Sequence, residues 1–375
     1  MNVIKVETCT YINKGPVITT TPLVIFLERV QESALRTYGQ KGFDTKLFVD
    51  MSLRHDLSET IEAFNKLSRT VNGSISVNDL DGFIGKYLGG PDEDLDKKTA
   101  SKLPNICEKR EFYRDLASAA ESGWDFSSRW MRNESDLTTT TTTSIVPVDL
   151  NKFLLKMELD IAFLANIIGE SSLVARFTEA SQNREKAMNS IFWNAEMGQW
   201  LDYWLANSNT SEVDIYKWED LHQNKKSFAS NFVPLWTELF RSDKITTQKV
   251  VQSLRSSGLL QPAGIAMTLS NTGQQWDFPN GWPPLKHIII EGFARSGLEE
   301  ARALPKDIAV RWIRTNYVAY KKTGAMYEKY DVTKCGAAGG GGVYVAQTGF
   351  GWANGVVLAL LEEFGWPEDL KIDCY

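Results

Sequence analysis

The chain has 375 residues, of which 43% are apolar and 23% charged, proportions typical of a globular protein with enough apolar side chains for a large core. Its net charge of −6 gives no reason to expect nucleic acid or an anionic membrane as a partner, and no apolar run approaches the roughly 20 residues that span a bilayer. Only three histidines occur, none at ligand spacing to another, which argues against a zinc site.

Twelve tryptophans are an unusual number for a chain of this length. In excess, tryptophan either fills a large core or lines a groove for flat, CH-rich ligands such as sugars. Three glycosylation triplets, at Asn72, Asn133 and Asn209, favour a secreted or membrane-anchored parent protein. The N-terminal residues lack the apolar core of a signal peptide, so the sequence does not identify the cellular compartment of the protein.

Apolar residues at three- and four-residue spacing predict helices separated by loops. In chain order, the expected helices cover residues 20–39, 55–73, 147–172 and 173–195, and approximately 284–296, 299–321 and 354–364. Strand-like alternation is rare, so we expect an all-α protein. Paired helices with Trp-rich loops at one end indicate a ring of helical hairpins around a central cleft, although the periodicity fits an α-solenoid equally well.

Six consecutive threonines at 138–143 form a low-complexity segment between two expected helices. Threonine is a poor helix former, so this run predicts a flexible surface loop. No linker elsewhere marks a domain boundary, and we therefore expect one domain over residues 1–375.

The first candidate for chemistry is AESGWDFSSRW at 120–130, where Gly123 lets the chain turn and two tryptophans flank Asp125. Apolar surroundings raise the pKa of a carboxyl group, as a general acid acting on a glycosidic oxygen requires. The alternative is that Asp125 caps the following helix, with Ser127 and Ser128 as ordinary helix-start residues. Without further context, the capping role is the better interpretation.

The second candidate is Glu328, which two tyrosines enclose in AMYEKYDV at 325–332. The commoner fate of such a residue is a helix-end carboxylate paired with Lys329 or Lys322.

A third cluster begins with Gln275, Trp276 and Asp277 and continues to Asn280 and Trp282. Its alternative is a rigid Pro/Gly turn whose tryptophans pack into the core, the better interpretation in isolation. All three clusters, however, join an acid or amide to aromatic residues in a loop at a helix end. Hydrolysis of a sugar acetal needs one acid, one base and aromatic walls, so the combination indicates a helical enzyme that processes glycosides.

Several stretches in fixed order resemble trehalase, glycoside hydrolase family 37. They are AESGWDFSSRW, IVPVDLN, GQQWDFPNGWPP, MYEKYD with GGGG, and QTGFGWANGVVL. Residues 275–284 match fully the family signature Gln-Trp-Asp-x-Pro-x-Gly/Ala-Trp-x-Pro, and the resemblance runs from about residue 85 to 366. It implies an (α/α)6 toroid and inverting hydrolysis of the disaccharide α,α-trehalose to two glucose molecules, with no metal or organic cofactor.

The resemblance also implies roles for individual residues. Asp125 would be the general acid and Glu328 the general base. The implied substrate-binding residues are Asp92, Gly123, Trp276 and Asp277. The four glycines at 339–342 would bring a bare, mobile backbone over the cleft.

The chain departs from the family pattern at several positions. Val343 stands where the family has a substrate-binding glutamate, and Gly90 where it has an arginine. Residues 18–22 replace an Arg-Ser-Gln-Pro-Pro motif, the first family signature is absent, and the chain begins where members are already about a third complete. We expect Val343 to weaken binding without abolishing chemistry.

These departures leave an alternative from another class, a trehalase-like sugar-binding protein or an inactive truncated homologue. A different (α/α)6 enzyme such as a glucoamylase is disfavoured, because the signature at 275–284 is specific.

Overall fold

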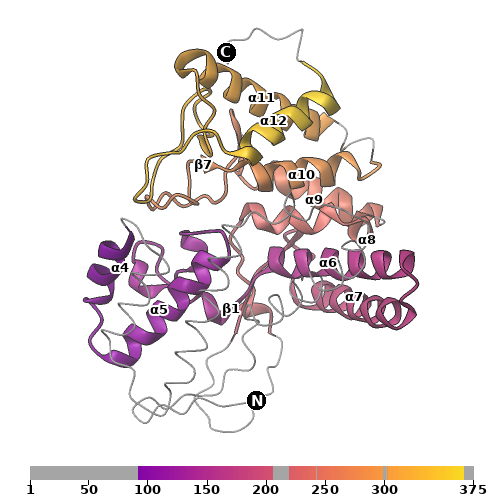
Figure 1. The fold of residues 1–375 in the computed structure, drawn as a ribbon, viewed down its shortest axis with the longest axis horizontal. Coiled ribbons are helices and arrows are strands. Elements are labelled where there is room, and N and C mark those ends of the chain that lie inside the picture. Colours follow the sequence, from indigo (N-terminus) through magenta and orange to yellow (C-terminus); the bar gives the residue numbers. More distant parts are fainter. Residues whose placement is uncertain (1–91, 206–218, 242, 299–300, 302, 367–375) are drawn as a thin grey trace, which may run out of the picture. The chain divides into compact units, whose positions relative to one another are not determined.

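A computed structural model describes residues 92–205, 219–241, 243–298, 301 and 303–366 (Figure 1). Spatial contacts divide the chain into two compact units, Met1–Tyr113 with Asn207–Asp214, and Arg114–Ala206 with Ile215–Tyr375. Within the first unit the structure describes α4 (Asp92–Ala100) and the beginning of α5 (Ile106–Glu121), which continues into the second. The helices expected at 20–39 and 55–73 lie outside the described residues, as do Gly90, residues 18–22 and the triplets at Asn72 and Asn209. The single domain over residues 1–375 stays a prediction.

The described part of the second unit is mostly helical, which confirms the all-α class. Its α-helices are α6 (Val148–Ile167), α7 (Ser171–Ile191), α8 (Glu238–Arg241), α9 (Lys244–Ser256), α10 (Pro283–Ala294), α11 (Ala303–Thr323) and α12 (Gly351–Phe364). The 3-10 helices are η3 (Ser128–Trp130), η4 (Leu137–Thr139), η5 (Thr142–Ser144), η6 (Asp220–His222) and η7 (Ala229–Trp236). In Figure 1, α6 and α7 run side by side, and α10, α11 and α12 form a second group.

Strands among the described residues are two residues long and pair antiparallel. The pairs are β1 (Ile145–Val146) with β4 (Tyr203–Trp204), β2 (Trp193–Asn194) with β3 (Gln199–Trp200), β5 (Leu260–Gln261) with β6 (Gly264–Ile265), and β7 (Asn280–Gly281) with β8 (Tyr330–Asp331). They join loops rather than build a sheet, and β7–β8 brings together the loops that contain Asp277 and Glu328.

The core accounts for many of the tryptophans. Its buried members include Trp124, Trp130, Trp200, Trp276, Trp282 and Trp312. Leucine, isoleucine and phenylalanine side chains from α10 and α11 complete this core, among them Ile290, Phe293 and Ile308. Burial of large apolar side chains is the main favourable contribution to folding, at about 1.5–3 kcal/mol each.

The threonine run is not a flexible surface loop, and that prediction was wrong. Residues 138–143 belong to η4 and η5 and the turn between them, and Thr140 and Thr142 are buried. The hydroxyl groups of Thr139 and Thr140 donate to the carbonyl oxygens of Asp136 and Leu137, both at 2.7 Å. Such local bonds from threonine to the backbone favour turns over regular helix, which explains how the run is ordered without an α-helix.

Membrane-spanning helices are absent from the described residues, where no helix combines the length and apolarity that a bilayer requires.

Candidate active site

The segment that carries Asp125 begins where α5 ends. Gly123 has φ of 76°, a conformation that favours glycine, and it turns the chain into an extended stretch. Ser127 then caps η3, because its hydroxyl accepts the Arg129 N–H at 3.1 Å. The alternative role of Asp125 as the helix cap was therefore wrong. The Asp125 side chain is half-buried beside this turn.

Asp277 fastens the signature loop to this segment. Its carboxylate is fully buried and accepts the Ser127 hydroxyl at 2.7 Å and the Ser128 N–H at 2.8 Å. Thr268 donates at 3.1 Å, and Thr272 donates as well. Burial raises the pKa of Asp277, and these hydrogen bonds oppose that rise without cancelling it. Both carboxylate oxygens of Asp277 therefore accept hydrogen bonds from other residues of the protein.

Arg129 anchors the other end of the segment. Its fully buried guanidinium pairs with Asp149 at 2.8 Å and with Asp202 at 2.7 Å, and each carboxylate accepts two N–H groups. Burial alone would lower the pKa of Arg129, but the two carboxylates outweigh it and raise the pKa overall. Sequence reasoning did not single out these three residues. Each of them belongs to a local sequence segment, but the hydrogen bonds join Arg129 to residues 20 and 73 positions away in the chain.

Three indole rings stack between the segment that carries Asp125 and the signature loop. The Trp276 ring lies 5.1 Å from that of Trp124 at an interplanar angle of 25°, and 4.2 Å from that of Trp282 at 3°. All three side chains are buried, and for Trp276 and Trp282 this is what the rigid-turn alternative for residues 275–284 predicted. The Trp276 indole N–H is buried and has no acceptor among the described residues.

Glu328 lies in the loop between α11 and β8 and is 6% exposed. Since α11 ends at Thr323, Glu328 is not a helix-end residue. The predicted pairing with Lys329 does occur, with Lys329 Nζ 3.2 Å from Glu328 Oε1. The Glu328 backbone N–H also donates to the Gln347 carbonyl at 3.0 Å, which ties this loop to the segment before α12.

Gln275 and Lys329 connect the two candidate carboxylates. Gln275 Nε2 lies 3.5 Å from Asp125 Oδ2 and also donates to the Asp125 carbonyl oxygen. On the other side, Lys329 Nζ donates to Gln275 Oε1 at 2.8 Å. The structure therefore brings Asp125, Trp276 and Glu328 into one cluster.

The glycine run packs closely against this cluster. The Gly339 N–H donates to the Lys329 carbonyl at 3.0 Å, and the Gly340 N–H to Asn280 Oδ1 at 3.0 Å. A Cβ atom on Gly339 would lie 2.6 Å from Asn280 Oδ1, and one on Gly341 would lie 2.6 Å from the Gly273 carbonyl oxygen. Gly339 and Gly341 are therefore needed for close backbone packing. Val343, which follows them, is 38% exposed.

The remaining predicted residues are less well connected to this cluster. Gly123 is exposed at the start of the Asp125 segment. Asp92 begins α4 in the first unit, so its substrate contact stays a prediction.

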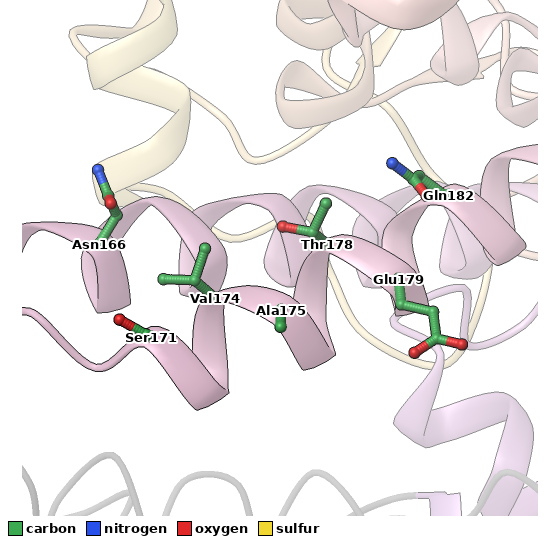
Figure 2. Close-up of a pocket in the computed structure, with 7 residues that line it drawn as sticks. All are labelled: Asn166, Ser171, Val174, Ala175, Thr178, Glu179 and Gln182. Atoms are coloured by element: carbon green, nitrogen blue, oxygen red, sulfur yellow. The ribbon is translucent and has the colours of Figure 1, made fainter.

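An open groove of about 430 Å³ lies elsewhere, along α7 and the end of α6 (Figure 2). Its lining residues are Asn166, Ser171, Val174, Ala175, Thr178, Glu179 and Gln182. None of them is a predicted site residue, and the groove has one carboxyl group, Glu179, in place of a carboxyl pair and has no aromatic wall.

Comparison with solved structures first defines the fold class. The neutral trehalase of Saccharomyces cerevisiae superposes with a TM-score of 0.53 at 24% identity, covering 76% of this chain and 48% of that chain. The fold is thus that of the (α/α)6 toroids, as the resemblance implied.

Sequence comparison then gives the family. The sequence model of the Trehalase family matches residues 92–365. A probable trehalase of Oryza sativa subsp. japonica is 59% identical over 75% of this chain and 50% of its own length. The trehalases of Arabidopsis thaliana and Homo sapiens are 53% and 36% identical over 74% and 85% of this chain, and over 44% and 55% of their own lengths. The chain belongs to the trehalase family and spans about half the length of the curated relatives it matches.

Proposed function

We propose that this chain hydrolyses α,α-trehalose to two glucose molecules with inversion, with Asp125 as general acid and Glu328 as general base. The observation that carries the proposal is the side-chain connection from Asp125 through Gln275 and Lys329 to Glu328. It joins two carboxyl groups from distant loops beside stacked aromatic rings, the combination that glycoside hydrolysis requires. Family membership supports trehalose as the substrate.

In this mechanism, Asp125 donates its proton to the oxygen between the two glucose units as the bond from the anomeric carbon to that oxygen breaks. Glu328 accepts a proton from a water molecule, whose oxygen forms the new bond to the anomeric carbon from the opposite face. One glucose leaves in the β form and the other in the α form. Before the next cycle, solvent removes the proton from Glu328 and returns one to Asp125.

Several neighbours support binding in this proposal. Gly123 is exposed two residues before Asp125 and Trp276 directly follows Gln275, and the family resemblance assigns both a sugar contact. Only the family resemblance supports a contact between Asp92 and the sugar. Asp277 contributes indirectly, because its oxygens already accept hydrogen bonds from the 127–128 turn.

A second candidate is a trehalase-like sugar-binding protein or an inactive homologue. The observation that favours it is Val343, an exposed apolar residue directly after the glycines, where the family has a substrate-binding glutamate. Each lost hydrogen bond to a polar sugar group costs on the order of 1–3 kcal/mol.

The test is glucose release from α,α-trehalose by the full chain, beside Asp125→Asn and Glu328→Gln. Both variants should lose activity by at least about 100-fold. Asp307→Asn, on the solvent side of α11, is the matched control. Proton NMR during the reaction should show equal initial amounts of α- and β-glucose. Trehalose binding measured by calorimetry without glucose release would instead favour the binding protein.

Val343→Glu separates weak binding from lost chemistry. If Val343 only weakens binding, the glutamate should lower KM for trehalose and leave kcat within about twofold. An unchanged KM would mean that this position does not face the sugar.

A further inference from the structure

We propose that Gln275 and Lys329 are positioning residues that assign each carboxyl group of the candidate pair one working oxygen. This inference rests on the proposed function, which assigns acid and base roles to Asp125 and Glu328.

The orientation of the Gln275 amide follows from the chemistry of its neighbour. Lys329 carries only donors, so the atom 2.8 Å from its Nζ must be the amide oxygen. The amide nitrogen then faces Asp125, where it lies 3.5 Å from Oδ2 and donates to the backbone oxygen. The Trp282 indole N–H further fixes the residue by donating to the Gln275 carbonyl at 3.0 Å.

An N–H donor beside Asp125 Oδ2 distinguishes the two oxygens of that carboxyl group. The donor disfavours a proton on Oδ2, because two hydrogens would then face each other, and it favours a proton on Oδ1. Once Oδ1 has released its proton to the substrate, the same N–H stabilises the carboxylate that remains. Gln275 therefore selects the oxygen from which the acid acts.

Lys329 selects the working oxygen of the general base, Glu328. Its side chain is fully buried, and a buried ammonium requires polar partners, which Glu328 Oε1 and Gln275 Oε1 provide. The Trp282 ring, 5.1 Å from the ammonium, adds a favourable face. With Oε1 of Glu328 engaged by Lys329, Oε2 is the oxygen that takes the proton from water.

The discriminating variant is Gln275→Glu, which keeps an oxygen toward Lys329 but replaces the N–H that faces Asp125 with an acceptor. The acid would then turn its proton toward the new carboxylate and away from the substrate. We expect kcat for trehalose to fall by about 10- to 100-fold with KM within about twofold.

A second substrate separates positioning from structural damage. Fluoride leaves α-glucosyl fluoride without needing a proton, so Gln275→Glu should hydrolyse this compound within about threefold of the native rate. Lys329→Met removes the ammonium beside the base and should slow both substrates to a similar extent, since both need the activated water. Gln252→Glu and Lys306→Met, on exposed faces of α9 and α11, are the matched controls.

The outcomes are distinguishable. Loss on trehalose with retention on the fluoride for Gln275→Glu supports the inference. Equal loss on both substrates, or no loss on either, overturns it while the proposed function stands. If the native chain hydrolyses neither substrate, the proposed function fails and the inference fails with it.

Discussion

At the scale of single residues, Lys286 is an unusual titratable group among the described residues outside the site. Its side chain is fully buried, its Nζ lies 3.2 Å from the centre of the Trp312 ring, and it has no hydrogen-bond acceptor among the described residues. Burial lowers the pKa of Lys286 well below its usual value of 10.5.

This burial makes stability depend on pH. The unfolded chain binds a proton at Lys286 below pH 10.5, whereas the folded chain does so only below the lowered pKa. Between these two values stability falls as pH falls, by about 1.4 kcal/mol per pH unit. Lys286→Met should therefore raise Tm, and more at pH 6 than at pH 9. Lys306→Met should change Tm little at either pH, and an equal gain for Lys286→Met at both would contradict the argument.

Arg129 shows how burial changes the value of an ion pair. Asp202→Asn would leave the buried guanidinium with one anion and should lower the free energy of unfolding by about 3–5 kcal/mol. Asp307→Asn removes a partly exposed pair with Arg311 and should cost at most about 1 kcal/mol. Urea unfolding of both variants measures the difference. Similar losses would mean that the Arg129 cluster contributes no more than a surface pair.

At the scale of elements, the glycine run sets how closely two loops approach. Gly341 has φ of 79°, and a Cβ atom there would lie 2.6 Å from the Gly273 carbonyl oxygen. A Cβ atom on Gly340 would meet nothing within 4 Å. Gly341→Ala should therefore lower Tm by several degrees, since a left-handed alanine alone costs about 1–2 kcal/mol. Gly340→Ala should change it by no more than about one degree, and equal effects would show that the packing is not responsible.

The helices differ in how far sequence reasoning could predict them. Long stretches with apolar periodicity correctly predicted five helices, with ends within a few residues of those observed: α6, α7, α10, α11 and α12. The pattern missed α9, whose sequence KITTQKVVQSLRS contains five β-branched residues in its first eight. Such residues favour strands, and here Asp243 overrides that preference by capping the helix through a 2.9 Å bond from the Ile245 N–H.

The candidate site was predictable in its composition but not in its connections. Asp125, Glu328 and Trp276 were identified because acidic and aromatic residues share short motifs. The role of Gln275 was not, since its partners Asp125 and Lys329 lie 150 and 54 positions away. No periodicity or local spacing encodes a contact between loops that only the folded helices bring together.

At the scale of the whole molecule, α6 leaves an apolar face uncovered. Phe163 and Ile167, one turn apart, are each 64% exposed, and Leu164 and Ile168 are exposed beside them. Contiguous patches of this kind promote association, whereas single exposed apolar residues are ordinary.

Exchange of Phe163 and Ile167 together for glutamine should reduce self-association of the chain. Sedimentation velocity at increasing concentration measures it, and the native chain should form larger species than the double variant. Leu221→Gln, at an exposed residue of η6, is the control and should behave like the native chain. If all three sediment alike, the α6 face does not drive association.

The stack of Trp124, Trp276 and Trp282 gives the site an optical signature. Indole rings at 4.2–5.1 Å couple their electronic transitions, and the 25° tilt of one pair makes that coupling chiral. The near-ultraviolet circular dichroism spectrum should therefore carry a paired band that vanishes in Trp276→Phe. Because the stack joins the segment that carries Asp125 to the signature loop, that band reports whether these two parts of the site are assembled in any variant, including those that have lost all catalysis.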